Sequence, residues 1–70
     1  MTSVTLCGFT SCCPTCEIEG DRFTITDDFG NTEVLNRREA DILSRMKGNQ
    51  IAFRSLRMGG DHAVALQQYI

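Results

Sequence analysis

All four cysteines of this chain of 70 residues fall within ten residues, at Cys7, Cys12, Cys13 and Cys16. A chain of this length has room for one small domain, whose core alone supplies only about 3–5 kcal/mol of stability. A metal ion or a disulfide at such a cluster would add usefully to that margin. Because we find no signal-peptide pattern and no apolar stretch of membrane-spanning length, we expect a cytoplasmic protein that does not bind membranes. In the reducing cytoplasm, clustered cysteines favour metal binding over disulfides.

The segment Cys13-Pro14-Thr15-Cys16 has the C-x2-C spacing with which a tight turn presents two thiolates to one zinc ion. It resembles the Cys-Pro-x-Cys knuckle of zinc ribbons and rubredoxins, although this sequence lacks the second knuckle of those families. The zinc ligands that we predict are Cys7, Cys12, Cys13 and Cys16. If only three thiolates reach the ion, His62 or water would complete the shell. An iron–sulfur cluster is not expected, because the interval after Cys12 does not fit the plant-type spacing.

Two other roles for the cysteines stay open. Cys13 and Cys16 could form a redox-active pair, although such pairs usually start a helix and this one precedes the strand-like Glu17-Ile18-Glu19. One or two of the cysteines could instead pack in the core as small apolar residues. We recognise no Ser/His/Asp set and no glycine-rich phosphate loop in the sequence, so we expect that the protein is not an enzyme.

The first half of the chain alternates polar and apolar residues, as β-strands with one buried face do. Strands are expected at residues 3–7, 17–19, 22–26 and 32–35, with a two-residue turn at Gly20-Asp21 and a longer turn over 27–31. Asp27 and Asp28 fall in the longer turn, where we expect their carboxylates to be solvated. The pattern predicts an antiparallel meander of three to four strands.

Helices are expected after the meander. Asn36 and Glu39 have the spacing of a capping box, which predicts a helix over 37–47. Residues 50–58 fit either a helix or a strand, and a helix is favoured because Gln50, Arg54 and Arg57 recur at i, i+4 and i+7. Asp61 is expected to cap a last helix over 62–69.

The predicted fold class is therefore α+β, with a short antiparallel β-meander of three to four strands followed by two or three helices packed on one face. We expect residues 1–70 to form a single domain with a cysteine-rich loop at 7–16. The predicted core contains Val4, Leu6, Ile18, Phe23, Ile25, Val34, Ile42, Leu43, Met46, Phe53 and Leu56.

The charge distribution bears on the choice between protein binding and nucleic-acid binding. Residues 1–35 carry one basic and six acidic side chains, whereas residues 36–70 carry six basic and three acidic ones. Arg54 and Arg57 would contact nucleic acid if the basic half served that purpose. Because the whole chain has a net charge of −2 and an isoelectric point near 5.1, its attraction to phosphate is modest. We therefore expect a non-catalytic regulatory or adaptor domain that binds another protein, with nucleic-acid binding and thiol redox activity as the alternatives.

Overall fold

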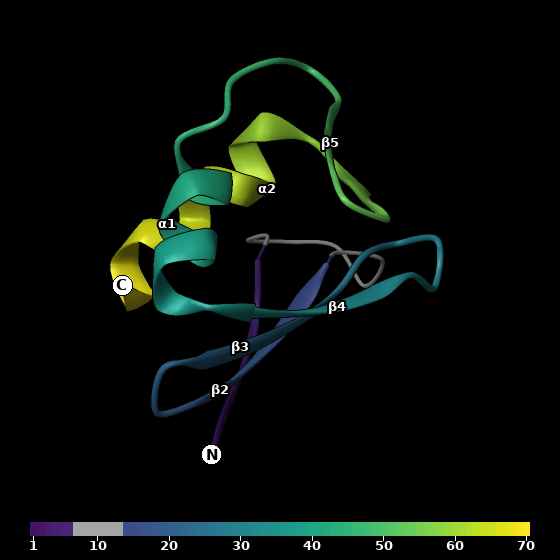
Figure 1. Cartoon of the computed structure of the whole chain (residues 1–70). Coiled ribbons are helices and arrows are strands. Elements are labelled where there is room, and N and C mark those ends of the chain that lie inside the picture. Colours follow the sequence, from purple (N-terminus) through teal and green to yellow (C-terminus); the bar gives the residue numbers. More distant parts are fainter. Residues whose placement is uncertain (7–13) are drawn as a thin grey trace.

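The computed structural model describes residues 1–6 and 14–70, so Cys7, Cys12 and Cys13 lie outside the described residues. Four strands form an antiparallel sheet in the order β1-β2-β3-β4 (Figure 1). Their bounds are Thr2–Thr5 for β1, Thr15–Glu19 for β2, Arg22–Thr26 for β3 and Thr32–Asn36 for β4. The predicted meander is confirmed, and Gly20 has the positive φ, 60°, that the tight turn between β2 and β3 requires.

The register of the sheet separates its two faces. Phe23 pairs with Ile18 on one side and Leu35 on the other, so these apolar residues share the inner face. The outer face carries a row of threonines, one from each strand, at Thr5, Thr15, Thr26 and Thr32. β-branched hydroxyl residues suit this position because they favour the strand and tolerate water.

Helix α1 (Arg37–Ser44) begins at the predicted capping box. The Asn36 side chain accepts a hydrogen bond from the Glu39 N–H at 2.8 Å, and the Glu39 carboxylate accepts one from the Asn36 N–H at 2.9 Å. Two unpaired donors of the first turn are thereby satisfied, which fixes where the helix starts. The helix ends at Ser44, three residues before the predicted end at 47, and Arg45 is its C-cap.

Residues 50–58 are not a helix, and that prediction was wrong. They form an antiparallel hairpin of β5 (Ile51–Phe53) and β6 (Leu56–Met58) around a turn at Arg54-Ser55. The hairpin buries Ile51, Leu56 and Met58. It is held by the meander, since the Arg57 N–H donates to the Asp27 carboxylate at 2.9 Å and the Ser55 N–H donates to the Glu33 carboxylate at 3.2 Å. Hydrogen bonds to these distant carboxylates stabilise the hairpin, and the helical spacing of the basic residues does not produce a helix.

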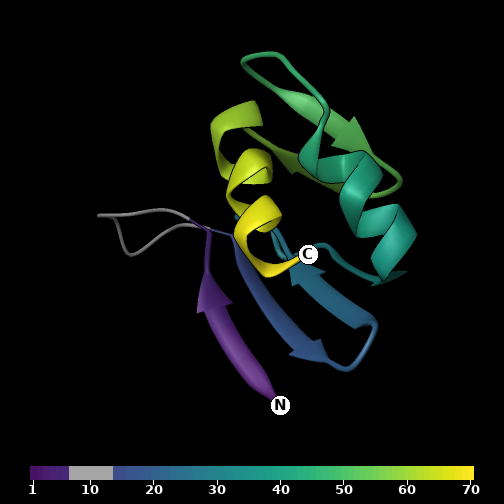
Figure 2. The ribbon, with the colours of Figure 1, turned by 90° about the vertical axis from the view of Figure 1, so that its left-hand side faces the viewer.

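The chain finishes with a short helix, α2 (Gly60–Val64), that tightens into the 3₁₀ turns of η1 (Ala65–Tyr69), and Figure 2 shows the two as one continuous coil. The N-cap is Gly59, with no side-chain hydrogen bond, so the expected cap by Asp61 was wrong. Within residues 1–6 and 14–70, no helix has both the length and the apolar character needed to cross a membrane.

The core joins the inner face of the meander to the helices and the hairpin. Val34 and Ile42 were wrongly placed in it, since they are 54% and 53% exposed. Val34 pairs with Thr24 on the outer face, and its neighbour Leu35 is buried instead. The buried apolar residues are Leu6, Cys16, Phe23, Ile25, Leu35, Ala40, Leu43, Ile51, Leu56, Met58, Ala63 and Leu66. The partly buried residues packed against them include Val4, Ile18, Met46 and Phe53, which were predicted.

Candidate functional site

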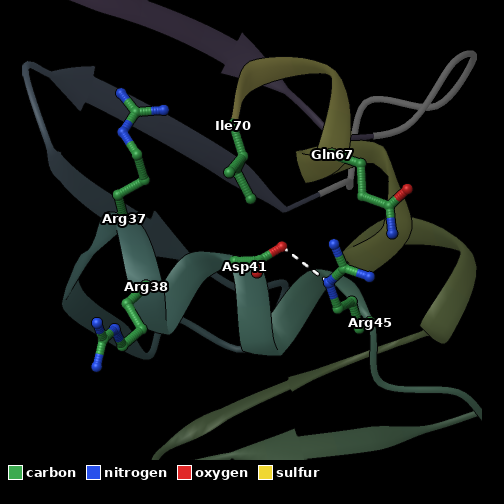
Figure 3. A pocket seen from close by; sticks show the side chains of 6 residues that line it. All are labelled: Arg37, Arg38, Asp41, Arg45, Gln67 and Ile70. Atoms are coloured by element: carbon green, nitrogen blue, oxygen red, sulfur yellow. Dashed lines mark hydrogen bonds and ion pairs between the residues drawn. The ribbon is translucent and has the colours of Figure 1, made fainter.

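An open groove of about 680 Å³ lies between α1 and the C-terminal end of the chain (Figure 3). Its lining residues are Arg37, Arg38, Asp41, Arg45, Gln67 and Ile70. Three of them belong to α1 and Arg45 is its C-cap, and their spacing of i, i+1, i+4 and i+8 places them along one side of the helix. Gln67 closes the opposite wall and donates from Nε2 to the Ser44 carbonyl oxygen at 3.2 Å. The groove walls are thus fixed to each other by this hydrogen bond.

A second hollow of about 370 Å³ continues this groove, because Arg45 and Gln67 line both. It adds Lys47 and Asp61 as charged residues and Met46 and Val64 as apolar ones. The combined lining, which we call the α1 groove, includes four basic side chains, Arg37, Arg38, Arg45 and Lys47, and two acidic ones, Asp41 and Asp61. The α1 groove is therefore locally basic on a chain whose net charge is −2.

The arginines of the α1 groove differ in how their own chain engages them. Arg37 donates from Nε to the Asp21 carboxylate at 2.8 Å, and its guanidinium lies 5.3 Å from the centre of the Phe23 ring. Arg45 pairs with Asp41 at 3.0 Å, but its side chain stays 70% exposed, and such surface pairs are weak. Arg38 is exposed and has no ion pair with any described residue. Among the arginines of the α1 groove, Arg38 and Arg45 are thus the most available to a partner.

The two predicted nucleic-acid contacts, Arg54 and Arg57, lie at the turn and in β6 of the hairpin and not on a helix. Arg54 forms an ion pair with Glu39 and stacks 5.7 Å from the centre of the Phe53 ring. Arg57 donates from Nη1 to the carbonyl oxygens of Arg54 and Leu56 at 2.8 and 2.9 Å. Both guanidinium groups are therefore used within the chain, which disfavours phosphate contacts at this place.

Cys16 is the one predicted zinc ligand among the described residues, and it is fully buried on the inner face of β2. Burial, together with the negative charge of Glu17, raises the pKa of its thiol to about 11. A buried and protonated thiol of this kind is a poor redox nucleophile. Within the described ranges, no three His, Cys, Asp or Glu side chains are grouped as metal ligands.

His62, the reserve ligand, has a buried Nδ1 atom without a hydrogen-bond partner in the part of the chain that the structure describes. A buried ring nitrogen in this state can still bind a water molecule or an ion. Its neighbour Ala63 belongs to the same core cluster as Leu6, whose N–H donates to the Pro14 carbonyl oxygen at 2.8 Å. Leu6 and Pro14 are the two ends of the connection that contains Cys7, Cys12 and Cys13.

The sequence analysis did not identify the α1 groove. The spacing of Arg37, Arg38, Asp41 and Arg45 along one helix was a readable signal, but the opposite wall comes from residues more than twenty positions away. No protein-family model, no curated protein and no solved structure matches this chain. The functions proposed below are therefore inferred from the residues of this chain alone.

Proposed function

We propose that this protein is a small non-catalytic binding domain that uses the α1 groove to hold an acidic segment of a partner protein. The observation that carries the proposal is the excess of basic side chains in the α1 groove of a net acidic chain. Complementary charge accelerates the encounter with an acidic partner and suppresses wrong ones.

The chemistry of the α1 groove favours a protein over a nucleic acid. Ile70 and Val64, which are 37% and 47% exposed, offer apolar contacts beside the cations. Among residues 1–6 and 14–70, no aromatic side chain lines either hollow, so these residues offer bases no stacking platform there. Carboxylates interspersed with aliphatic residues would satisfy both the cations and the apolar contacts.

Titration with a synthetic peptide of glutamate and leucine residues tests the proposal, with amide chemical shifts as the readout. We expect shifts confined to α1, α2 and η1, and a two- to fivefold weaker affinity for Arg38→Gln, since one exposed ion pair contributes about 0.2–1 kcal/mol. Arg22→Gln is the matched control, because it removes the same charge from an exposed residue of the sheet. Equal affinity of both variants, or stronger binding of a DNA duplex at the same salt concentration, would contradict the proposal.

We also propose that the cysteine-rich connection binds zinc in the cytoplasm, with Cys7, Cys12 and Cys13 as thiolate ligands and His62 as the fourth. The buried Nδ1 atom of His62, which has no hydrogen-bond partner among the described residues, supports this choice. Neutral imidazole and thiolates are the usual ligands of structural zinc. Cys16 is left as a core residue, because its side chain is fully buried in the apolar core cluster.

Native mass spectrometry of protein purified without chelator tests this second proposal. We expect about one zinc ion per chain, lost in Cys13→Ser and His62→Gln and retained in Cys16→Ala. Metal-free protein that is folded, with Cys7, Cys12 and Cys13 freely alkylated, would refute zinc binding. Loss of zinc in Cys16→Ala, with Cys16→Ala still folded, would restore the set of four cysteines.

A further inference from the structure

We propose that strand β1 pairs with β1 of a second copy of this chain, which joins two four-stranded sheets edge to edge. The register of β1, its lack of charge and its symmetry support this pairing, which involves neither the α1 groove nor zinc.

Strand β1 forms one edge of the four-stranded sheet. β1 is the outermost strand of the meander and pairs with β2 alone in the part of the chain that the structure describes; Figure 2 shows it at the margin of the sheet. The Leu6 N–H donates to the Pro14 carbonyl oxygen, and hydrogen-bonded pairs alternate along an antiparallel ladder. Thr2, Val4 and Leu6 therefore direct their backbone groups toward β2. Ser3 and Thr5 direct theirs outward, where β2 cannot reach them.

Within its four residues, the strand carries no side chain of the kinds that usually protect a free edge. Its sequence, Thr2-Ser3-Val4-Thr5, has no charged side chain and no proline. Natural edges are commonly blocked by lysine, proline, a bulge or an inward-pointing charge. The opposite edge, β4, does carry an acidic residue on its inner face, Glu33, which pairs with Ile25. Of the two edges, β1 is thus the one open to strand addition.

The strand is also complementary to itself. An antiparallel arrangement with a two-fold axis at Val4 places Ser3 opposite Thr5 of the second copy, and Thr5 opposite its Ser3. Each of these two pairs exchanges two N–H···O bonds, so all outward groups of both residues are used. Val4 then faces Val4 of the second copy as a close, non-hydrogen-bonded pair on the inner face. Val4 already packs on the core cluster, so the apolar interior extends across the joint.

Amide hydrogen exchange in reducing buffer, measured over a range of protein concentrations, tests the pairing. For a dissociation constant of about 0.1 mM, mass action lowers the monomer fraction about threefold between about 0.05 and about 1 mM protein. The Ser3 and Thr5 amides should slow by the same factor, while Val4 and Leu6 are protected at every concentration. Exchange of Ser3 and Thr5 that does not depend on concentration, whether fast or slow, would overturn the proposal.

Proline variants separate pairing between copies from the integrity of the monomer. Ser3→Pro removes an outward N–H that β2 does not use, so the fold should persist while sedimentation shows only monomer. Ser3→Ala keeps that N–H and is the matched control, which should associate like the parent chain. Thr5→Pro makes the same test at the second position, in case Ser3→Pro does not fold. A folded proline variant that associates as strongly as the parent would refute the proposal.

Discussion

The carboxylate of Asp27 accepts a hydrogen bond from the backbone N–H of Arg57, thirty residues further along the chain, at 2.9 Å. The same carboxylate accepts bonds from the Phe29 N–H at 2.8 Å, the Asn31 N–H at 2.9 Å and the Asn31 side-chain amide at 3.0 Å. Asp27 is only 5% exposed, so the expectation that it is solvated was wrong. One side chain thus closes the turn between β3 and β4 and fastens the hairpin to the meander.

We predict that Asp27→Asn destabilises the protein by about 1–3 kcal/mol, because an amide would present a donor to groups that are themselves donors. Urea unfolding followed by circular dichroism measures the loss. Asp28→Asn is the control, since it makes the same charge change at the exposed neighbouring residue and should alter stability by less than about 0.5 kcal/mol. Equal losses in the two variants would show that charge, and not these hydrogen bonds, sets the effect.

Acid should weaken the attachment of the hairpin. Burial opposes ionisation of Asp27, but its hydrogen bonds outweigh burial and lower its pKa below the ordinary 3.8. The hydroxyl and N–H of Ser55 lower the pKa of Glu33 below its ordinary 4.5. A carboxyl group whose pKa is lower in the folded state stabilises fully above its unfolded pKa and loses that contribution as pH falls through the folded value.

The free energy of unfolding should therefore decrease below about pH 4 and decrease less steeply in Asp27→Asn than in the parent. A series of urea titrations from about pH 7 to about pH 2.5 measures both slopes. Parallel curves for the parent and the variant would contradict the assignment to Asp27.

Truncation of two neighbouring residues of α1 should change the stability of the protein by very different amounts. Leu43 is fully buried, whereas Ile42 is 53% exposed. Leu43→Ala should cost about 2–5 kcal/mol, enough to unfold much of a domain of this size, and Ile42→Ala should stay within about 0.5 kcal/mol. Thermal unfolding compares them, and Leu43→Met, which conserves volume, keeps the comparison measurable if Leu43→Ala does not fold. A larger loss for Ile42→Ala would mean that α1 is rotated from the position described.

The elements predicted from the sequence are those fixed by neighbouring residues. The capping box joins Asn36 and Glu39 within one turn, and the turn at Gly20 depends on a single positive φ. The residues of such local patterns form hydrogen bonds with one another, so these elements depend little on contacts with distant parts of the fold.

The hairpin of β5 and β6 could not be predicted in that way. Its turn places Arg54 at a φ of 55°, which is unusual for this residue type, and two of its backbone donors bond to carboxylates more than twenty residues away. The sequence did contain a signal for a hairpin, because Ile51, Leu56 and Met58 fall on one face when a two-residue turn separates the strands. The basic residues at helical spacing obscured that signal. The α1 groove was missed for a related reason, because α1 and η1 form its walls only after the chain has folded.

Cys16 should behave as a core residue, although it belongs to the cysteine cluster. Its thiol lies among apolar side chains with a pKa raised to about 11, so only about a thousandth of it is thiolate near pH 8. In folded protein, alkylation followed by peptide mapping should leave Cys16 unmodified, and it should react at once in urea.

Substitution of the same residue separates packing from thiol chemistry. Cys16→Ser should destabilise more than Cys16→Ala, because serine brings a hydroxyl into an apolar site at a cost of about 1–3 kcal/mol, whereas alanine removes only the sulfur atom and leaves a small cavity. The free energy of unfolding by urea, measured with the other cysteines unchanged, ranks the two variants. Rapid alkylation of Cys16 in the folded chain, or an alanine variant less stable than the serine one, would contradict the buried position and return Cys16 to the reactive cluster.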